Sequence, residues 1–315
     1  MQSLLSGDYM QELESYVCDQ FPMRDRFRVL ESVFCFYVFR QMDNGGVYLI
    51  DGTVYKSDPV LDDNAVRLTA ERINGIIEKY LDEDTKVWYS VIPDKNYFAA
   101  GRGYPTMDYD RLISELDENL DDISYIDIFG TLDITDYYRT DIHWRQEKLA
   151  DTAGTLLDAM GVRRTESVYT PHSLRPFYGA YYGMAGLPVE PDELIYLTSP
   201  LTDSASVTAL DPNAEKSVYA PDRIDGMDGY DVFLSGAQSV ITMETGSGSG
   251  RELILFRDSF GSSIAPLLLE GYSKITLVDL RYIVSDKLGE YVDFENADVL
   301  FLYSTTLINN GGVLR

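Results

Sequence analysis

Basic residues and histidine are scarce in this 315-residue chain, and each shortage excludes a class of function. Only 26 Lys and Arg face 52 Asp and Glu, which gives a formal net charge of -26 at pH 7. Such a charge repels nucleic acids and anionic membrane surfaces, so neither is an expected partner. With His143 and His172 as the only histidines, a His-rich metal site is excluded, and we expect no metal and no other cofactor.

Cysteine and long apolar runs are also scarce. Cys18 and Cys35 are too few for a disulfide framework and lack the spacing of a zinc or redox motif, so the simplest interpretation is two buried thiols. No run of about 18 apolar residues is present to cross a bilayer, and the first eight residues lack the basic start and apolar core of a signal peptide. Membrane attachment would therefore need an N-terminal anchor that this sequence does not contain, and the sequence leaves the oligomeric state open.

Helical and strand patterns alternate along most of the chain. Amphipathic spacing predicts helices, and short apolar runs predict strands between them. The helices are expected over 63–80, 108–120, 146–160 and 263–270, and the strands over 87–92, 123–129, 239–243, 252–256, 274–278 and 299–303. This alternation predicts an α/β fold, a parallel sheet covered by helices on both faces in three α/β/α layers, as in flavodoxin-like folds.

Two regions depart from this rhythm. Residues 1–45 have helical spacing, interrupted at Phe21-Pro22, and are expected to form an N-terminal helical extension. The α/β domain is expected over 46–315 and to begin with a hairpin over 47–55. Within it, residues from about 162 to 238 are rich in Tyr, Pro, Gly and Asp and predict an irregular insertion that carries substrate contacts.

The strongest candidate for a catalytic base is His143. It lies between the strand expected over 123–129 and the helix expected over 146–160, and such loops form the ligand crevice of an open α/β sheet. Asp141 can accept the imidazole Nδ1–H and leave Nε2 free as a base. The alternative, that Asp141 caps the following helix and His143 only packs, is equally compatible with this stretch.

The candidate nucleophile is Ser259, which follows the strand expected over 252–256. The turn leads into a helix with Pro266 in its first turn, so the serine hydroxyl is expected at the carboxyl edge of the sheet. The amides of this turn and of Gly261 would stabilise an oxyanion. A serine in this context also commonly caps a helix, so the prediction depends on its conjunction with the His–Asp pair at one sheet edge.

These candidates belong to segments that resemble a known family. Residues 140–144 read T-D-I-H-W and residues 256–260 read F-R-D-S-F, a combination that resembles the bacterial DHHW proteins, SGNH-hydrolase-like relatives of the proteins of alginate O-acetylation. Further segments match in the family's order, namely D-Q-F-P-M-R-D at 19–25, I-P-D-K at 92–95, Y-S-K-I at 272–275 and D-L-R-Y at 279–282. The resemblance covers most of the chain.

The resemblance implies an SGNH-like domain in which Ser259 is the nucleophile, His143 the general base and Asp141 its orienting carboxylate. It implies a serine esterase or O-acetyltransferase that acts on a glycan of the cell envelope or a secreted glycan, and hence an extracytoplasmic location. A glycan or another acyl donor or acceptor is the partner to expect. The alternative is a catalytically silent protein that binds a glycan or serves as a scaffold in the assembly of an envelope polysaccharide.

The chain departs from the family's pattern at two places. Ile142 stands where the motif has its first histidine, and it is expected to point away from the triad. The family's G-G-N before the serine strand is replaced by Ser235 to Gln238, which leaves Gly236, Gln238 and the amides of Ser259 and Gly261 as candidate oxyanion donors. The candidate substrate contacts are Arg139, Trp144 and Tyr138; the alternatives are an ion pair for the arginine and packing for the two aromatic residues.

Overall fold

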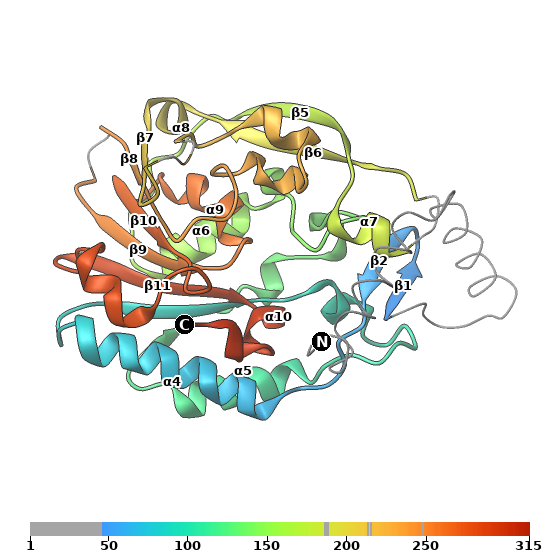
Figure 1. Ribbon diagram of the computed structural model, residues 1–315, viewed down its shortest axis with the longest axis horizontal. Helices are drawn as coiled ribbons and strands as arrows, with labels where there is room; N and C mark the ends of the chain where they lie inside the picture. The colour runs from blue at the N-terminus through green and yellow to red at the C-terminus, as the bar shows by residue number, and fades with distance from the viewer. Residues whose placement is uncertain (1–45, 186–188, 213, 215, 247–248) are drawn as a thin grey trace, which may run out of the picture.

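A seven-stranded sheet forms the centre of the computed structural model, which describes residues 46–185, 189–212, 214, 216–246 and 249–315 (Figure 1). The strand order is β4-β3-β11-β9-β10-β8-β7. The strands are β3 (Val87–Ile92), β4 (Ser124–Tyr125), β7 (Ser206–Ala209), β8 (Val240–Glu244), β9 (Glu252–Arg257), β10 (Lys274–Val278) and β11 (Ala297–Ser304). The helical extension predicted for residues 1–45 lies outside the described residues.

The sheet is mostly parallel, not wholly parallel as predicted. The five strands from β4 to β10 run parallel, whereas β8 is antiparallel to β10, and β7 is antiparallel to β8. The expected strand over 123–129 shrinks to two residues, because the chain bends after Ile126 into a short 3-10 helix in which the Asp127 carboxylate accepts the Phe129 N–H. The carboxyl ends of β3, β9, β10 and β11 meet at one edge of the sheet.

Helices lie along both sides of the sheet (Figure 1). Residues of β9 alternate between two apolar cores, since Leu253 and Leu255 belong to one and Ile254 and Phe256 to the other. The first core also takes residues of α6 (Ala150–Ala159) and α9 (Gly261–Leu268), and the second takes residues of α4 (Asp63–Tyr80) and α5 (Tyr109–Asn119). A short helix, α10 (Thr305–Ile308), follows β11.

Most predicted helices are confirmed, and their ends have local causes. The Asp62 side chain accepts the Ala65 N–H and begins α4 at the predicted residue. The helix predicted over 146–160 begins with a 3-10 turn, and only Ala150–Ala159 are α-helical. The helix α9 begins at Gly261, two residues earlier than predicted, so Pro266 lies inside it and not in its first turn. None of the helices among the described residues is both long and apolar enough to cross a membrane.

The segment 162–238 contains more regular structure than predicted. It forms a two-stranded antiparallel sheet of β5 (Thr170–Phe177) and β6 (Asp192–Thr198), the helices α7 (Ala180–Ala185) and α8 (Pro200–Ser204), and β7 of the main sheet. Many side chains of β5 are exposed, so the strand has no apolar run to reveal it. The predicted N-terminal hairpin is confirmed as β1 (Val47–Ile50) and β2 (Thr53–Lys56).

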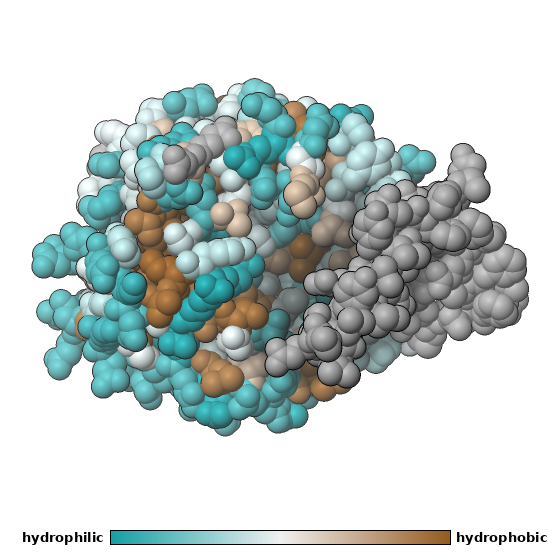
Figure 2. All heavy atoms as spheres, in the orientation of Figure 1, coloured by the Kyte–Doolittle hydropathy of each residue, from teal (hydrophilic) through white to brown (hydrophobic). Residues whose placement is uncertain are grey.

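Hydrophilic residues cover much of the molecular face in Figure 2, and apolar residues gather over its middle. This distribution agrees with the strongly acidic composition.

Candidate active site

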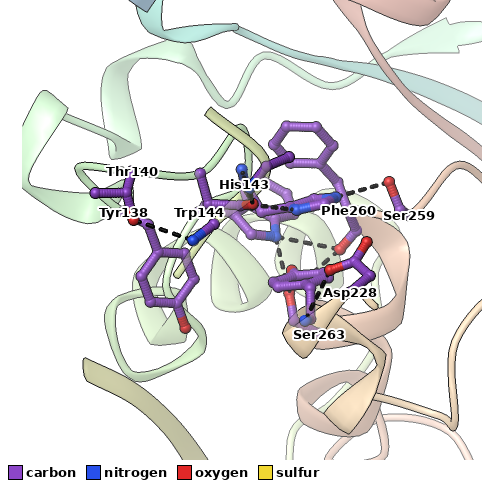
Figure 3. A network of polar contacts seen from close by, with 12 residues as sticks. Tyr138, Thr140, His143, Trp144, Asp228, Ser259, Phe260 and Ser263 are labelled. Atoms are coloured by element: carbon purple, nitrogen blue, oxygen red, sulfur yellow. Dashed lines mark hydrogen bonds and ion pairs between the residues drawn. The ribbon is translucent and has the colours of Figure 1, made fainter. Parts of the chain in front are cut away.

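Ser259, His143 and Asp141 form one hydrogen-bonded chain at the carboxyl edge of the sheet. His143 Nε2 lies 2.7 Å from Ser259 Oγ, and His143 Nδ1 lies 2.6 Å from Asp141 Oδ1. Because an ionised carboxylate only accepts, Nδ1 carries the proton of the neutral imidazole, and Nε2 then accepts from the serine hydroxyl. Figure 3 shows the imidazole directed toward Ser259. The arrangement is that of a nucleophile, a base and an orienting carboxylate.

Ser259 lies in a tight turn that the preceding aspartate stabilises. The Asp258 carboxylate accepts the N–H of Phe260 at 3.0 Å and that of Ser304 at 2.9 Å, which joins the turn to the end of β11. Gly261 is needed because a Cβ there would lie 2.5 Å from Arg257 Cβ. No side chain caps α9, so the alternative in which Ser259 is a helix cap is wrong.

Asp141 is buried, and hydrogen bonds hold both oxygens of its carboxylate. Its Oδ1 accepts both the backbone N–H and the ring Nδ1–H of His143, and its Oδ2 accepts the Ala180 N–H at 2.7 Å. Burial alone would raise the pKa of this carboxyl, but the charge and hydrogen bonds of His143, together with the Ala180 amide, lower it below its ordinary value. Asp141 does not cap the following helix, and the capping alternative is wrong.

The predicted insertion supplies two supports for this loop. Gly179 approaches so closely that a Cβ there would lie 2.3 Å from Asp141 Cβ. The carboxylate of Asp192, in β6, accepts the N–H groups of Arg139 and Thr140 and the Thr140 hydroxyl, at 2.6 to 3.0 Å. The insertion therefore shapes the site from behind the triad, a role that its composition did not predict.

His143 lies between two aromatic rings. The Tyr230 ring stacks on the imidazole, with centroids 3.7 Å apart and planes inclined by 4°, and Phe260 packs at 4.8 Å. The Tyr230 hydroxyl bonds Ser263 Oγ at 2.6 Å, and Trp144 Nε1 donates to the same oxygen. Sequence reasoning missed Tyr230, because nothing in its local context distinguishes it from the other 23 tyrosines.

None of the three predicted substrate contacts lines the hollow in which Ser259 lies. Trp144 and Tyr138 are fully buried and serve packing, so neither reaches a ligand. Arg139 pairs with Asp192 and lines a hollow that also takes in Arg175 and does not include Ser259.

Of the four predicted oxyanion donors, Gly236, Gln238 and the Gly261 amide make other contacts. Gly236 has a φ of +88° and faces Asp231, and Gln238 Nε2 lies 3.4 Å from the Leu234 carbonyl oxygen in its own loop. The Gly261 N–H donates to the Asp258 carbonyl oxygen at 3.1 Å. By contrast, the Ser259 N–H has no hydrogen-bond partner among the described residues, and it is the amide nearest the hydroxyl.

Ser259 opens into a hollow of about 510 Å³. Ile142, Phe260 and Leu307 contribute apolar walls, and Arg281 and Asn310 contribute polar ones. Ile142 thus lines the space in front of the serine, and Ser259, His143 and Asp141 are hydrogen-bonded without the motif's first histidine. A larger hollow, of about 800 Å³ beside Arg251, includes none of the three triad residues, so size alone does not locate the site.

The fold is shared with solved structures whose sequences differ widely from this one. A DHHW family protein from Eubacterium siraeum has a TM-score of 0.71 at 21% identity, over 86% of this chain and 94% of that one. Bacillus cereus PatB1, solved with a sulfonyl adduct, has a TM-score of 0.67 at 15% identity, over 83% and 95%. The O-acetyltransferase domain of Pseudomonas putida AlgJ has a TM-score of 0.53 at 10% identity, over 84% and 92%.

These similarities show that the chain has the fold of a DHHW family protein, as the motifs predict, and that PatB1 and the AlgJ domain share this fold. No family model matches the sequence, and no curated protein matches it.

Proposed function

We propose that this protein is an SGNH-like serine esterase or O-acetyltransferase with a three-layer α/β/α domain. The observation that carries the proposal is the hydrogen-bonded chain from Asp141 through His143 to Ser259. Such a chain activates a hydroxyl that is otherwise a weak nucleophile at neutral pH.

The reaction proceeds in two steps. Ser259 Oγ attacks the carbonyl carbon of an acyl ester while His143 Nε2 takes the hydroxyl proton. The tetrahedral intermediate collapses, the leaving alcohol takes the proton from His143, and the acyl group remains on Ser259. A water molecule or a sugar hydroxyl then gives its proton to His143 and attacks the acyl-enzyme, which releases an acid or a new ester and restores the serine.

The Ser259 amide is the donor that we propose for the oxyanion, because its N–H is free of other partners among the described residues and belongs to the nucleophile itself. Gly236, Gln238 and the Gly261 amide make other contacts. Any further oxyanion donor therefore comes from groups that line the hollow, such as Asn310.

Two further features support acyl transfer to a glycan at an extracytoplasmic location. The motifs resemble those of alginate O-acetylation proteins, and one protein of the same fold is an O-acetyltransferase domain. The sulfonyl adduct on PatB1 is the kind of product that an activated nucleophile forms.

A second candidate function is a catalytically silent, glycan-binding or scaffold protein of an envelope polysaccharide assembly. It is favoured by one observation, that none of residues 235–238 lines the hollow that contains Ser259. A weak oxyanion site would leave binding without turnover.

Hydrolysis of p-nitrophenyl acetate tests the proposal. We expect turnover by the wild type that Ser259→Ala and His143→Ala each reduce to the uncatalysed rate, with unchanged thermal unfolding. Supply of soluble oligosaccharides then separates transfer from hydrolysis, since a transferase forms acetylated sugar at the expense of acetate. Equal rates in all three proteins would favour the silent alternative.

A further inference from the structure

Lys95 is a buried lysine whose ammonium group faces the loop that carries Asp141 and His143. It follows β3 at the carboxyl edge of the sheet and is 3% exposed. Its Nζ donates to three backbone carbonyl oxygens of that loop, those of Tyr138 and Asp141 at 2.9 Å and that of Arg139 at 3.3 Å. An ammonium has three hydrogens, so one is available for each carbonyl.

The groups around Lys95 are aromatic rings and carboxylates, which attract a cation. The rings of Tyr55 and Tyr181 lie 5.6 and 5.2 Å from Nζ, at a distance for cation–π attraction. Asp141, Asp192 and Asp94 are the carboxylates that act on it through their charge. The three donated bonds nevertheless go to peptide oxygens, and not to any of these carboxylates.

The same loop is held from its other side by an anion. Asp192 accepts the N–H groups of Arg139 and Thr140, while Lys95 takes carbonyl oxygens of residues on either side of Thr140. The C=O and N–H of one peptide point in opposite directions. Lys95 binds the carbonyl oxygens and Asp192 the N–H groups of the same peptides, so these peptides are held from both sides. Neither side chain hydrogen-bonds Ser259 or His143, so both act on the site through the backbone of the loop.

We propose that Lys95 is a positioning residue for the proposed acyl transfer, one that holds the backbone of Asp141 so that its carboxylate meets His143 Nδ1. The inference rests on the proposed function only for its effect on rate. The Asp141 carbonyl is a direct partner of Lys95, and the Asp141 carboxylate is a direct partner of His143. A shift of the loop by about 1 Å therefore reaches the imidazole through a single residue, and shifts of that size cost about 100-fold in rate.

The experiment compares Lys95→Met with Lys56→Met, which makes the same change at an exposed lysine at the end of β2. Ester hydrolysis gives kcat and KM for each, and proton NMR records the far-downfield resonance of the His143 Nδ1–H that bonds Asp141. The variant His143→Ala identifies that resonance, since His172 is the only other histidine. The spectra are taken below the pKa of Lys95, which burial lowers to about 7.

We expect Lys95→Met to fold, to lose the His143 resonance and to lower kcat by about 10- to 100-fold with KM nearly unchanged, whereas Lys56→Met matches the wild type. A folded Lys95→Met that keeps the resonance overturns the proposal, whatever its kcat. Lys95→Gln retains two donors and replaces Lys95→Met in the experiment if the methionine variant does not fold. If neither variant folds, Lys95 is required for folding of the whole domain, and its specific role in the loop is overturned. If the wild type has no Ser259-dependent turnover, the proposed function fails while the resonance still tests Lys95.

Discussion

Tyr230 lies flat on the imidazole of His143, with the two ring centroids 3.7 Å apart. The tyrosine comes from a 3-10 helix near the end of the insertion, 87 residues after the histidine, and its hydroxyl is fixed by Ser263 of α9. The stack closes one face of the imidazole and restricts its rotation about the bond to the chain. Tyr230 therefore helps to keep Nε2 directed at Ser259.

Two substitutions of Tyr230 distinguish the contribution of its ring from that of its hydroxyl. Tyr230→Phe keeps the stack and loses one hydrogen bond, for which we expect a stability loss of about 1 kcal/mol and nearly normal kcat. Tyr230→Leu removes the stacked ring, and we expect kcat to fall by up to about tenfold, the rate equivalent of a ring contact of about 1.5 kcal/mol. Steady-state kinetics with thermal unfolding measure both. Equal kcat in the two variants would exclude a role for the stacked ring.

Asp141→Asn tests the orienting carboxylate. Both carboxylate oxygens accept N–H groups, so an amide NH₂ in either place would face a donor. We expect kcat to fall by about 10⁴-fold, as for the equivalent change in serine proteases, because the imidazole adopts the wrong tautomer. The measurement is kcat and KM for p-nitrophenyl acetate. A kcat near that of the wild type would mean that Asp141 only supports the loop.

Gly179→Ala tests the close approach behind the triad. A methyl group there would lie 2.3 Å from Asp141 Cβ and 2.4 Å from the Thr140 carbonyl oxygen, so the backbone has to move. We expect about a 100-fold loss of kcat. Gly183→Ala in α7 is the matched control, since nothing lies within 4 Å of the added methyl group, and it should keep full activity. Equal activity of both variants would contradict this packing.

The pH dependence of stability tests the burial of Lys95. Its pKa in the folded chain is lowered to about 7, below the ordinary value of 10.5. Between these values the unfolded chain binds one more proton than the folded chain, so this group makes stability rise with pH. The free energy of unfolding of the wild type relative to Lys95→Met should therefore increase above pH 7, by at most about 1.4 kcal/mol per pH unit. Denaturant titrations at several pH values measure it, and a flat or falling difference would contradict the lowered pKa.

The fold was predictable where burial leaves a regular pattern. The apolar run of β9 and the helical spacing of α4 each gave the right element, because both are packed against a core along their length. The antiparallel direction of β8 was not predictable, since apolar residues record burial and not direction. The sheet of β5 and β6 was missed because β5 is largely exposed and has no apolar run, so the apolar run of β6 at 194–197 had no visible partner strand.

The juxtaposition of the three proposed catalytic residues was predictable from their positions in the chain. Asp141 and His143 are two residues apart and Ser259 follows a clear strand, so loop position alone brought them to one edge. The directions in which the other candidate side chains point were not predictable, because they depend on packing with distant segments. Trp144 turns into the core and Gln238 toward its own loop, and neither direction is encoded in the neighbouring residues.

The formation of an acyl-enzyme on Ser259 tests the central claim most directly. The protein is treated with p-nitrophenyl acetate, quenched in acid and digested with trypsin, which releases residues 258–274 as one peptide that also contains Ser262, Ser263 and Ser273. Fragmentation of this peptide by mass spectrometry locates the acetyl group. We predict one acetyl group on Ser259 and none in Ser259→Ala or His143→Ala. An unmodified peptide under conditions of turnover, or acetyl groups that persist in Ser259→Ala, would contradict the account.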